Sequence, residues 1–284
     1  MKRVAFVVHA GRAAALEAAA EVVDWLGEQD VATRQLEGES IGAGETAPWE
    51  ALAEDADLVV SFGGDGTFLR AAHVASRANC PVLGVKVGRL GFLTEVEPGE
   101  TPALVESYLS GEARVEERTA LIAEPQGNVW GEPQWALNEV IVEKRARHRL
   151  IKLAVAVDGE AVTTISADGV IVATPTGSTA YSFSARGPIV SPNLACLIVT
   201  PVAAHMVFDR SIVLGPEESV TLTVVGEEPG VLSADGRESL ELPVGSAVRI
   251  AAARDPALLV RPESGRGFFT LVRDKFGLPG GAPR

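Results

Sequence analysis

Apolar segments change their pattern once along this chain, close to Gly111, and this change limits the folds open to it. Before that point, short apolar runs such as Arg3–His9 and Asp57–Phe62 alternate with helix-like segments such as Arg12–Gln29 and Thr67–Arg77. Continuous apolar runs are typical of strands covered on both faces, and their alternation with helices indicates an open parallel sheet. The first part of the chain is therefore predicted to be an α/β domain.

Beyond Gly111 the apolar segments are short, often alternating, and separated by glycine, proline, aspartate and asparagine. Asp158-Gly159 has the composition of a tight hairpin turn. These features predict a mostly antiparallel, sandwich-like β domain. We expect an α/β domain with a parallel sheet over residues 1–112, a β-rich domain over 113–266, and a C-terminal helix over 267–284 that packs back on the first domain.

The net charge and the cysteine content limit which classes of partner the protein can bind and in which cellular compartment we expect it. The formal net charge of -13 argues against a nucleic-acid backbone or an anionic membrane surface as a partner. No apolar stretch approaches the length of a membrane span. Cys80 and Cys196 are far apart and lack metal-ligand spacing, as expected of buried thiols in a reducing cytosol. We therefore expect a cytoplasmic protein.

Three glycines surround one carboxylate directly after the apolar run that ends at Phe62. Gly63, Gly64 and Gly66 allow close backbone approach and positive φ angles, and the start of the following helix can face an anion. A simple tight turn with Asp65 as the helix N-cap is the alternative. Phosphoryl transfer to an alcohol explains the charge, because a carboxylate can orient the hydroxyl and accept its proton.

Two further segments suggest a nucleotide. Residues 168–188 surround Tyr181 with threonine, serine and glycine, which suits the polar edges and the ring of a base, although a plain polar loop is the alternative. Asn138-Glu139 lies inside an otherwise apolar strand, where adjacent side chains face opposite sides. One of the two should therefore point inward, unless the pair marks an exposed strand end.

Several other patterns carry less weight. Gly38–Gly42 matches a nucleophile elbow, but a loop follows where a helix is required. The chain has no Walker A loop and no GxGxxG motif after its first strand. Its four histidines lack metal-ligand spacing, and His205 is compatible with either a core position or a site.

Together these segments resemble the NAD kinase family. The matching residues are GGDGT at Gly63–Thr67, GRLGFL at Gly88–Leu93, Asn138-Glu139, and DGVIVATPTGSTAYSFSA at Asp168–Ala185. Weaker similarity continues through Asp235–Arg237 to the C-terminal segment. GGDGT alone also occurs in lipid kinases, whereas the combination is specific.

The resemblance implies phosphorylation of the 2′-hydroxyl of the adenosine ribose of NAD by ATP, with Mg²⁺ as the expected divalent metal, at a site between two domains. It implies that Asp65 is the catalytic base. It implies substrate binding by Gly64, Gly66, Asn138, Glu139, Arg149, Asp168, Thr179, Ala180, Tyr181 and Ser184. Members of the family usually form homodimers or homotetramers.

Two positions depart from the family pattern. Lys86 stands where asparagine is general, and Arg186 stands where glycine is usual. Both add positive charge near the predicted site. We expect phosphate or subunit contacts from Lys86, Arg89, Arg186, His205, Arg210 and Arg237. A lipid or sugar kinase that shares GGDGT, and a noncatalytic NAD(P)-binding sensor, are the alternative functions.

Overall fold

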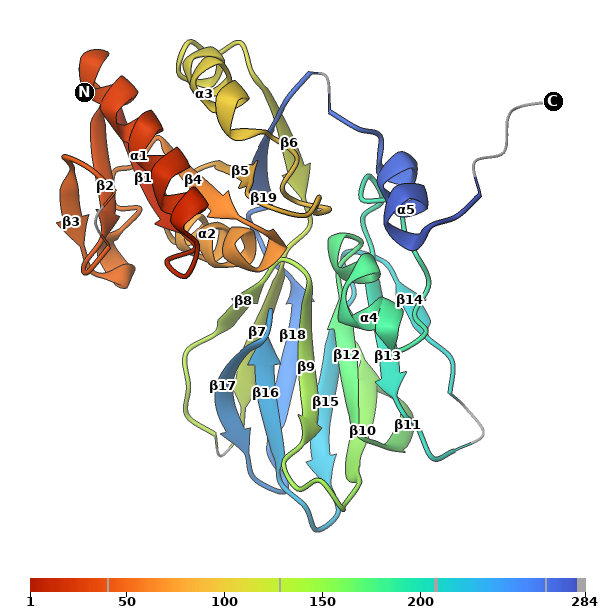
Figure 1. Ribbon diagram of the computed structural model, residues 1–284. Helices are drawn as coiled ribbons and strands as arrows, with labels where there is room; N and C mark the ends of the chain where they lie inside the picture. Colours follow the sequence, from red (N-terminus) through yellow and green to blue (C-terminus); the bar gives the residue numbers. More distant parts are fainter. Residues whose placement is uncertain (40, 128, 207–208, 264, 280–284) are drawn as a thin grey trace. The chain divides into compact units, whose positions relative to one another are not determined.

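The structure, a computed structural model, describes residues 1–39, 41–127, 129–206, 209–263 and 265–279, with only the backbone described at 238–239 (Figure 1). The chain divides into two compact units. The first comprises Met1–Glu117 and Ala257–Arg284, and the second comprises Arg118–Pro256. Within the described residues, no helix is both long and apolar enough to cross a membrane.

The first unit contains a seven-stranded sheet. Its strands, in spatial order, are β3 (Glu45–Ala47), β2 (Ala32–Leu36), β1 (Arg3–Val8), β4 (Leu58–Gly63), β5 (Val82–Lys86), β19 (Ala257–Arg261) and β6 (Arg114–Arg118). The five neighbouring pairs from β3 to β19 are parallel. This confirms the predicted α/β domain with a mostly parallel sheet.

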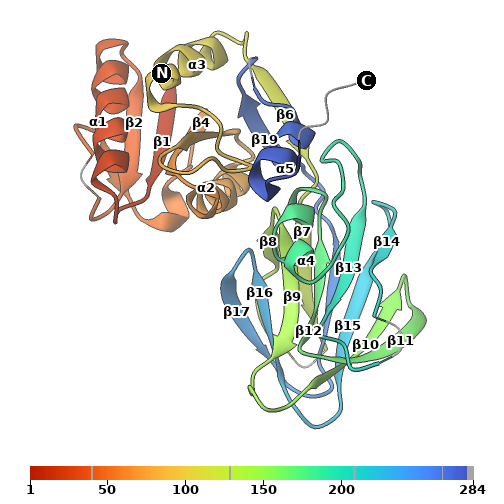
Figure 2. The ribbon, with the colours of Figure 1, turned by 45° about the vertical axis from the view of Figure 1, so that its right-hand side comes forward.

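Helices cover both faces of this sheet (Figure 2). They are α1 (Ala13–Glu28), α2 (Asp65–Ala78) and α3 (Thr101–Leu109), with short helical turns η1 (Trp49–Ala51) and η2 (Pro98–Glu100). Alternate residues of β1, including Val4 and Phe6, share one apolar cluster with α1 and α3. The buried side chains of α2 lie outside that cluster and cover the opposite face.

The boundaries of the two units differ from the expected ones. The strand β19 falls within residues 113–266, which the sequence analysis assigned to the β-rich domain, but it pairs in parallel with β5. The strand β6 likewise belongs to the first sheet. A short run such as Ala257–Arg261 shows that a strand forms, but its local pattern does not indicate which sheet it joins.

The second unit consists of two six-stranded sheets. One has the order β11 (Glu160–Ala167), β10 (Ile151–Val157), β15 (Val220–Val225), β18 (Ala247–Ala252), β7 (Leu121–Gln126), β8 (Gln134–Ala136). The other has the order β14 (Ile212–Leu214), β13 (Leu197–Val202), β12 (Gly169–Ala173), β9 (Glu139–Lys144), β16 (Gly230–Ala234), β17 (Arg237–Leu242). Every assigned pairing in both sheets is antiparallel, which confirms the predicted sheet type.

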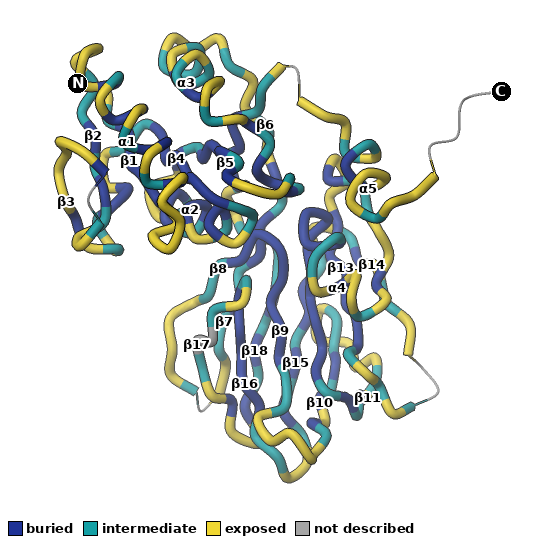
Figure 3. The backbone as a smooth tube through the Cα atoms, in the orientation of Figure 1, coloured by how far each residue is buried: buried dark blue, intermediate teal, exposed yellow. Residues whose placement is uncertain are grey.

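A single apolar core joins the two sheets of the second unit. It includes Leu153 and Leu222 from one sheet and Val142 and Val172 from the other. Figure 3 shows buried backbone concentrated along these strands, with exposed backbone at the turns. The predicted hairpin turn joins β10 to β11, and Asp158 and Gly159 both have positive φ, at 48° and 84°. That geometry is the one a type I′ turn requires.

Candidate active site

Asp65 is the first residue of α2 and lies directly beyond the carboxyl end of the buried strand β4. Its carboxylate accepts hydrogen bonds from the N–H of Phe92 (2.9 Å), the N–H of Leu93 (3.1 Å) and the hydroxyl of Thr94 (3.3 Å). The N-cap position belongs to Gly64, and no side chain caps the helix. Asp65 is therefore oriented by a neighbouring loop rather than by its own helix.

Gly91 explains how this loop approaches so closely. A Cβ atom at this position would lie 1.9 Å from Oδ1 of Asp65 and 2.5 Å from Oγ1 of Thr94. Any side chain at Gly91 would therefore displace the carboxylate or the threonine. The GRLGFL segment after strand β5, together with the adjacent Thr94, thus holds Asp65.

The glycines around Asp65 serve different purposes. None of Gly63, Gly64 and Gly66 has a positive φ, so the expected left-handed conformation is wrong for this turn. A Cβ at Gly63 would clash with Thr67 at 2.4 Å, whereas Cβ atoms at Gly64 and Gly66 would meet nothing within 4 Å. The backbone beside Asp65 therefore has open space in front of it, and the start of a 14-residue helix faces that space.

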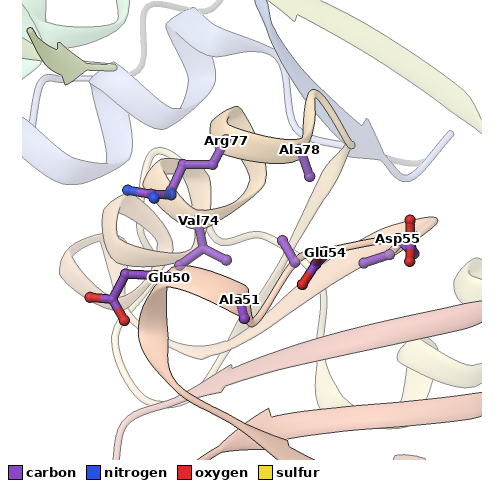
Figure 4. Close-up of a pocket in the computed structure, with 9 residues that line it drawn as sticks. Glu50, Ala51, Glu54, Asp55, Val74, Arg77 and Ala78 are labelled. Atoms are coloured by element: carbon purple, nitrogen blue, oxygen red, sulfur yellow. The ribbon is translucent and has the colours of Figure 1, made fainter.

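A separate hollow of about 570 Å³ opens elsewhere on the first unit (Figure 4). Glu50 and Glu54 lie on one side of it, and Val74 and Arg77 of α2 lie on the other. Arg77 lies twelve positions after Asp65 on the same helix, which at a rise of 1.5 Å per residue is about 18 Å. No predicted site residue lines this hollow, so it is not the candidate site.

In the second unit, Asn138 and Glu139 are held by the carboxylate of Asp235. Asp235 accepts hydrogen bonds from three consecutive N–H groups, those of Leu137 (2.7 Å), Asn138 (2.8 Å) and Glu139 (3.1 Å). Three successive backbone donors around one anion form a nest. Asp235 lies in the turn between β16 and β17, so the pairing of distant strands sets the Asn138-Glu139 backbone.

The second predicted loop packs directly on the same backbone. The N–H of Thr174 donates to the Asn138 carbonyl (2.8 Å), and its hydroxyl donates to the Leu137 carbonyl (2.6 Å). A Cβ at Gly177 would lie 2.1 Å from the Asn138 carbonyl oxygen. The loop therefore brings η3 (Thr176–Thr179) and α4 (Tyr181–Ser184) beside the Asn138-Glu139 pair.

Glu139 is the most unusual ionisable group of this region. It is 9% exposed, and its Oε2 has no hydrogen-bond partner among the described residues. Burial, and then the charge of Asp235, raise the pKa of Glu139 to about 8. A hydrogen bond from the backbone N–H of Tyr181 opposes this shift. Both Asn138 and Glu139 are buried, so the alternative of an exposed strand end is wrong.

Tyr181 stands near several carboxylates and is 40% exposed. Burial, followed by the charges of Glu143, Asp168 and Glu139, raises the pKa of its phenol. Asp168 itself forms an ion pair with Lys144 at 2.5 Å. Of the other predicted residues in the second loop, Thr179 and Ala180 are half-buried and Ser184 is exposed. The second unit thus gathers Glu139, Asp168 and Tyr181 in one neighbourhood.

Comparison with known proteins shows the family of this chain. The family model for the ATP-NAD kinase N-terminal domain matches residues 4–113, and the model for the ATP-NAD kinase C-terminal domain matches residues 137–262. The chain belongs to the NAD kinase family. The predicted family and its predicted class, a phosphotransferase of NAD kinase type that uses ATP and NAD, are confirmed.

Individual NAD kinase relatives agree with this assignment. The chain is 37% identical to the NAD kinase of Mycobacterium bovis, covering 98% of this chain and 96% of that one. It is similar to a crystal structure of an NAD kinase from Archaeoglobus fulgidus in complex with ATP (28% identity, TM-score 0.75, 98% and 100% of the two chains). A yeast NADH kinase complexed with NADH shares the fold (24% identity, TM-score 0.87, 100% and 89%).

The other basic residues that were predicted to contact substrate, phosphate or a subunit of this NAD kinase family member differ in their ion pairs and exposure. Lys86 pairs with Glu97 (2.5 Å), Arg149 with Glu228 (3.5 Å) and Arg210 with Asp209 (3.5 Å), while Arg89 and His205 are exposed. Arg237 donates to the carbonyls of Ala234 and Trp135, and burial lowers its pKa. Arg186 has φ +68°, a conformation that glycine adopts without strain.

Four groups around Asp65 and around the Asn138-Glu139 pair were not predicted for this NAD kinase family member. Thr94 and the backbone of residues 92–93 hold Asp65, and Asp235 holds the Asn138-Glu139 pair. Gly177 allows the second loop to reach that pair. All of these groups lie in or beside segments that resemble the family, so the sequence indicated the regions. No local sequence pattern indicates which acceptor a given backbone N–H will bind.

Proposed function

We propose that this NAD kinase family member transfers the γ-phosphoryl group of ATP to the 2′-hydroxyl of the adenosine ribose of NAD, with Asp65 as the general base. The observation that carries this proposal is the orientation of the Asp65 carboxylate. Three donors fix it, while glycine backbone beside it leaves room for a reactant. A carboxylate oxygen accepts up to two hydrogen bonds, so capacity remains for a substrate hydroxyl.

The chemistry then follows from the geometry of in-line displacement. The substrate hydroxyl donates to Asp65, its oxygen attacks the γ-phosphorus, and the bond from that phosphorus to the bridging oxygen breaks. ADP leaves with the electron pair, and the hydroxyl proton passes to Asp65. The N–H groups at the start of α2, near Gly64 and Gly66, face the negative phosphates.

Groups of the second unit supply nucleoside recognition in this proposal. The unpartnered Oε2 of Glu139 is a candidate partner for a ribose hydroxyl, because a buried polar atom without a hydrogen bond is costly. Its neighbours with proposed substrate contacts are Asn138, Asp168, Thr179, Ala180, Tyr181 and Ser184. Arg149, whose side chain is 64% exposed, is a proposed contact for a substrate phosphate.

Mg²⁺ fits this site only if oxygens of the bound ATP phosphates supply some of its ligands. The described residues contain no group of three or more histidine, cysteine, aspartate or glutamate side chains that could hold a metal ion. Mg²⁺ usually binds through substrate phosphates and one or two carboxylates, so Asp65 and the phosphate oxygens would hold it. When bound, it would offset the negative charge that gathers on the phosphates.

We also propose a homodimeric or homotetrameric assembly in the cytoplasm. The resemblance to NAD kinases supports the assembly, and two free, buried cysteines fit a reducing compartment. Light scattering of the purified protein measures the assembly. A monomer at micromolar concentration would contradict it.

One assay tests the proposed reaction. Purified protein receives Mg-ATP and NAD, and an NADP-specific dehydrogenase reports the NADP formed, with NADH and polyphosphate tested in parallel. We expect Asp65→Asn to lower kcat by about 100-fold or more without unfolding the protein. Glu50→Gln, in the separate hollow, is the matched control and should leave turnover unchanged. The absence of NADP with every donor would reject the proposal.

A further inference from the structure

The C-terminal helix α5 (Phe268–Phe276) places a lysine beside Asp65. Lys275 lies in the last turn of this helix, and its Nζ is 4.0 Å from Oδ2 of Asp65. Both side chains are partly accessible, at 28% for Lys275 and 31% for Asp65. Helix α5 and Asp65 belong to the same compact unit, although 210 positions separate residue 275 from residue 65.

Phe92 sets the position of this lysine. The Phe92 ring packs against Phe268 (6.3 Å between centroids) and Phe276 (6.1 Å), and Lys275 Nζ lies 5.1 Å from the centre of the same ring. The backbone N–H of Phe92 also donates to Asp65. One residue therefore orients the carboxylate and docks the helix that carries the cation.

The ammonium group of Lys275 donates no hydrogen bond to Asp65 in this arrangement. A distance of 4.0 Å is too long for a hydrogen bond, and the oxygens of Asp65 already accept from Phe92, Leu93 and Thr94. Lysine has three N–H donors, and the described part of the chain places no acceptor within hydrogen-bonding distance of them. Those donors are free to bind an anion that sits next to Asp65.

We propose that Lys275 is a catalytic residue that donates hydrogen bonds to the oxygens of the transferring phosphoryl group. This inference rests on the proposed function of Asp65. The hydroxyl that Asp65 orients bonds to the γ-phosphorus, so the phosphoryl oxygens come within a few ångströms of the carboxylate, where the ammonium lies. Charge on these oxygens must be stabilised as the bond to ADP breaks. Lys275 keeps its proton throughout, while the hydroxyl proton goes to Asp65.

A packing role is the competing explanation, because the lysine stem covers the Phe92 ring. Lys275→Met keeps an unbranched apolar stem and removes the ammonium group with its charge and N–H donors, and Lys275→Arg restores both with different geometry. Arg273→Met is the matched control, since Arg273 is on the same helix and its partner is Asp274. Kinetic constants and unfolding temperatures of these three variants, together with rescue of Lys275→Ala by an added amine, separate the two explanations.

We expect Lys275→Met to lower kcat for NADP formation by about 100-fold, the typical loss when one transition-state donor is removed. Its KM for NAD and its unfolding temperature should stay near those of the wild type, and Arg273→Met should retain wild-type turnover. Lys275→Arg should recover part of the lost turnover. Added ethylammonium ions should stimulate Lys275→Ala, which a packing role does not predict.

Two results would overturn the role of Lys275. One is a Lys275→Met variant with turnover within threefold of the wild type. The other is a loss of turnover that neither arginine nor ethylammonium restores and that accompanies a lower unfolding temperature. The wild-type assay keeps this test separate from the proposed function: no NADP from the wild-type protein rejects that function, whereas an active wild type with an equally active Lys275→Met rejects the lysine alone.

Discussion

At the scale of single residues, two features of the candidate site are a missing side chain at Gly91 and an unpartnered carboxylate oxygen at Glu139. Asp65 reaches its three donors because Gly91 has no side chain. Glu139 is buried with one carboxylate oxygen unpartnered among the described residues. Neither feature is needed for stability alone, and both are what the proposed function expects of residues that bind a ligand.

Gly91→Ala should therefore impair turnover more than folding. The new methyl group would lie 1.9 Å from Oδ1 of Asp65, so the carboxylate must rotate away from Phe92 and Leu93. We expect kcat to fall by roughly 100-fold, because small displacements of a catalytic group are costly. Steady-state kinetics measures this. Gly99→Ala, where a Cβ would meet nothing within 4 Å, is the control, and equal activities would contradict the prediction.

Glu139 should make stability depend on pH. Its pKa is raised from 4.5 to about 8, so folding favours the protonated form. That contribution is fully present below about pH 4.5 and is lost as pH rises towards 8, at up to roughly 1.4 kcal/mol per pH unit. Glu139→Gln should flatten the dependence. Urea unfolding between pH 5 and pH 8.5 tests this, and identical slopes for both proteins would refute it.

Arg186 adopts a left-handed conformation at φ +68°. Left-handed backbone costs a residue with a Cβ about 1–2 kcal/mol, and part of that is offset by the greater unfolded-state entropy of glycine. Arg186→Gly should thus raise the free energy of unfolding by about 0.5–1 kcal/mol. Thermal unfolding measures it, and a destabilised variant would show that the arginine side chain compensates for the strain.

At the scale of elements, loops hold other loops by backbone hydrogen bonds. The β16–β17 turn holds residues 137–139 through Asp235, and the Thr174–Gly177 segment packs on the same backbone. Such contacts link three segments that are distant in sequence. They make the position of Glu139 a property of the β sandwich rather than of its own strand.

Asp235→Asn should weaken NAD binding. An amide supplies one acceptor oxygen, and its NH₂ group would face N–H donors of residues 137–139. We expect the KM for NAD to rise about tenfold and the unfolding free energy to fall by about 1–3 kcal/mol. Asp158→Asn is the control, because Asp158 also caps a backbone N–H, that of Ser219, in a turn of the same unit. A similar KM change in both variants would contradict a specific role.

At the scale of the whole molecule, the chain leaves the first unit after Glu117 and returns to it at Ala257. The returning strand β19 pairs with β5, and Arg261 at its end forms ion pairs with Glu95 (2.6 Å) and Glu116 (3.2 Å). All three side chains are less than 15% exposed. The first unit is thus completed by residues from both ends of the sequence.

Arg261→Met should destabilise the first unit strongly. Removing the guanidinium breaks the ion pairs of Arg261 with two nearly buried carboxylates, and breaking a buried pair costs about 3–5 kcal/mol. Arg254→Met, at an exposed position, is the control. Urea unfolding followed by a probe in each unit measures the effect. Equal stabilities of the two variants would contradict it.

The sequence by itself determined the α/β and β-rich character of the two parts, because apolar periodicity is a local property that survives without tertiary contacts. It also determined the family, and it predicted where the candidate site lies, since GGDGT, Asn138-Glu139 and the segment around Tyr181 are contiguous motifs. It did not determine that β19 joins the first sheet, that Asp65 binds residues 92–94, or that Lys275 stands beside it. Those are decided only in three dimensions, because pairing across many residues depends on which strands and loops compete for the same position, and no local pattern records that competition.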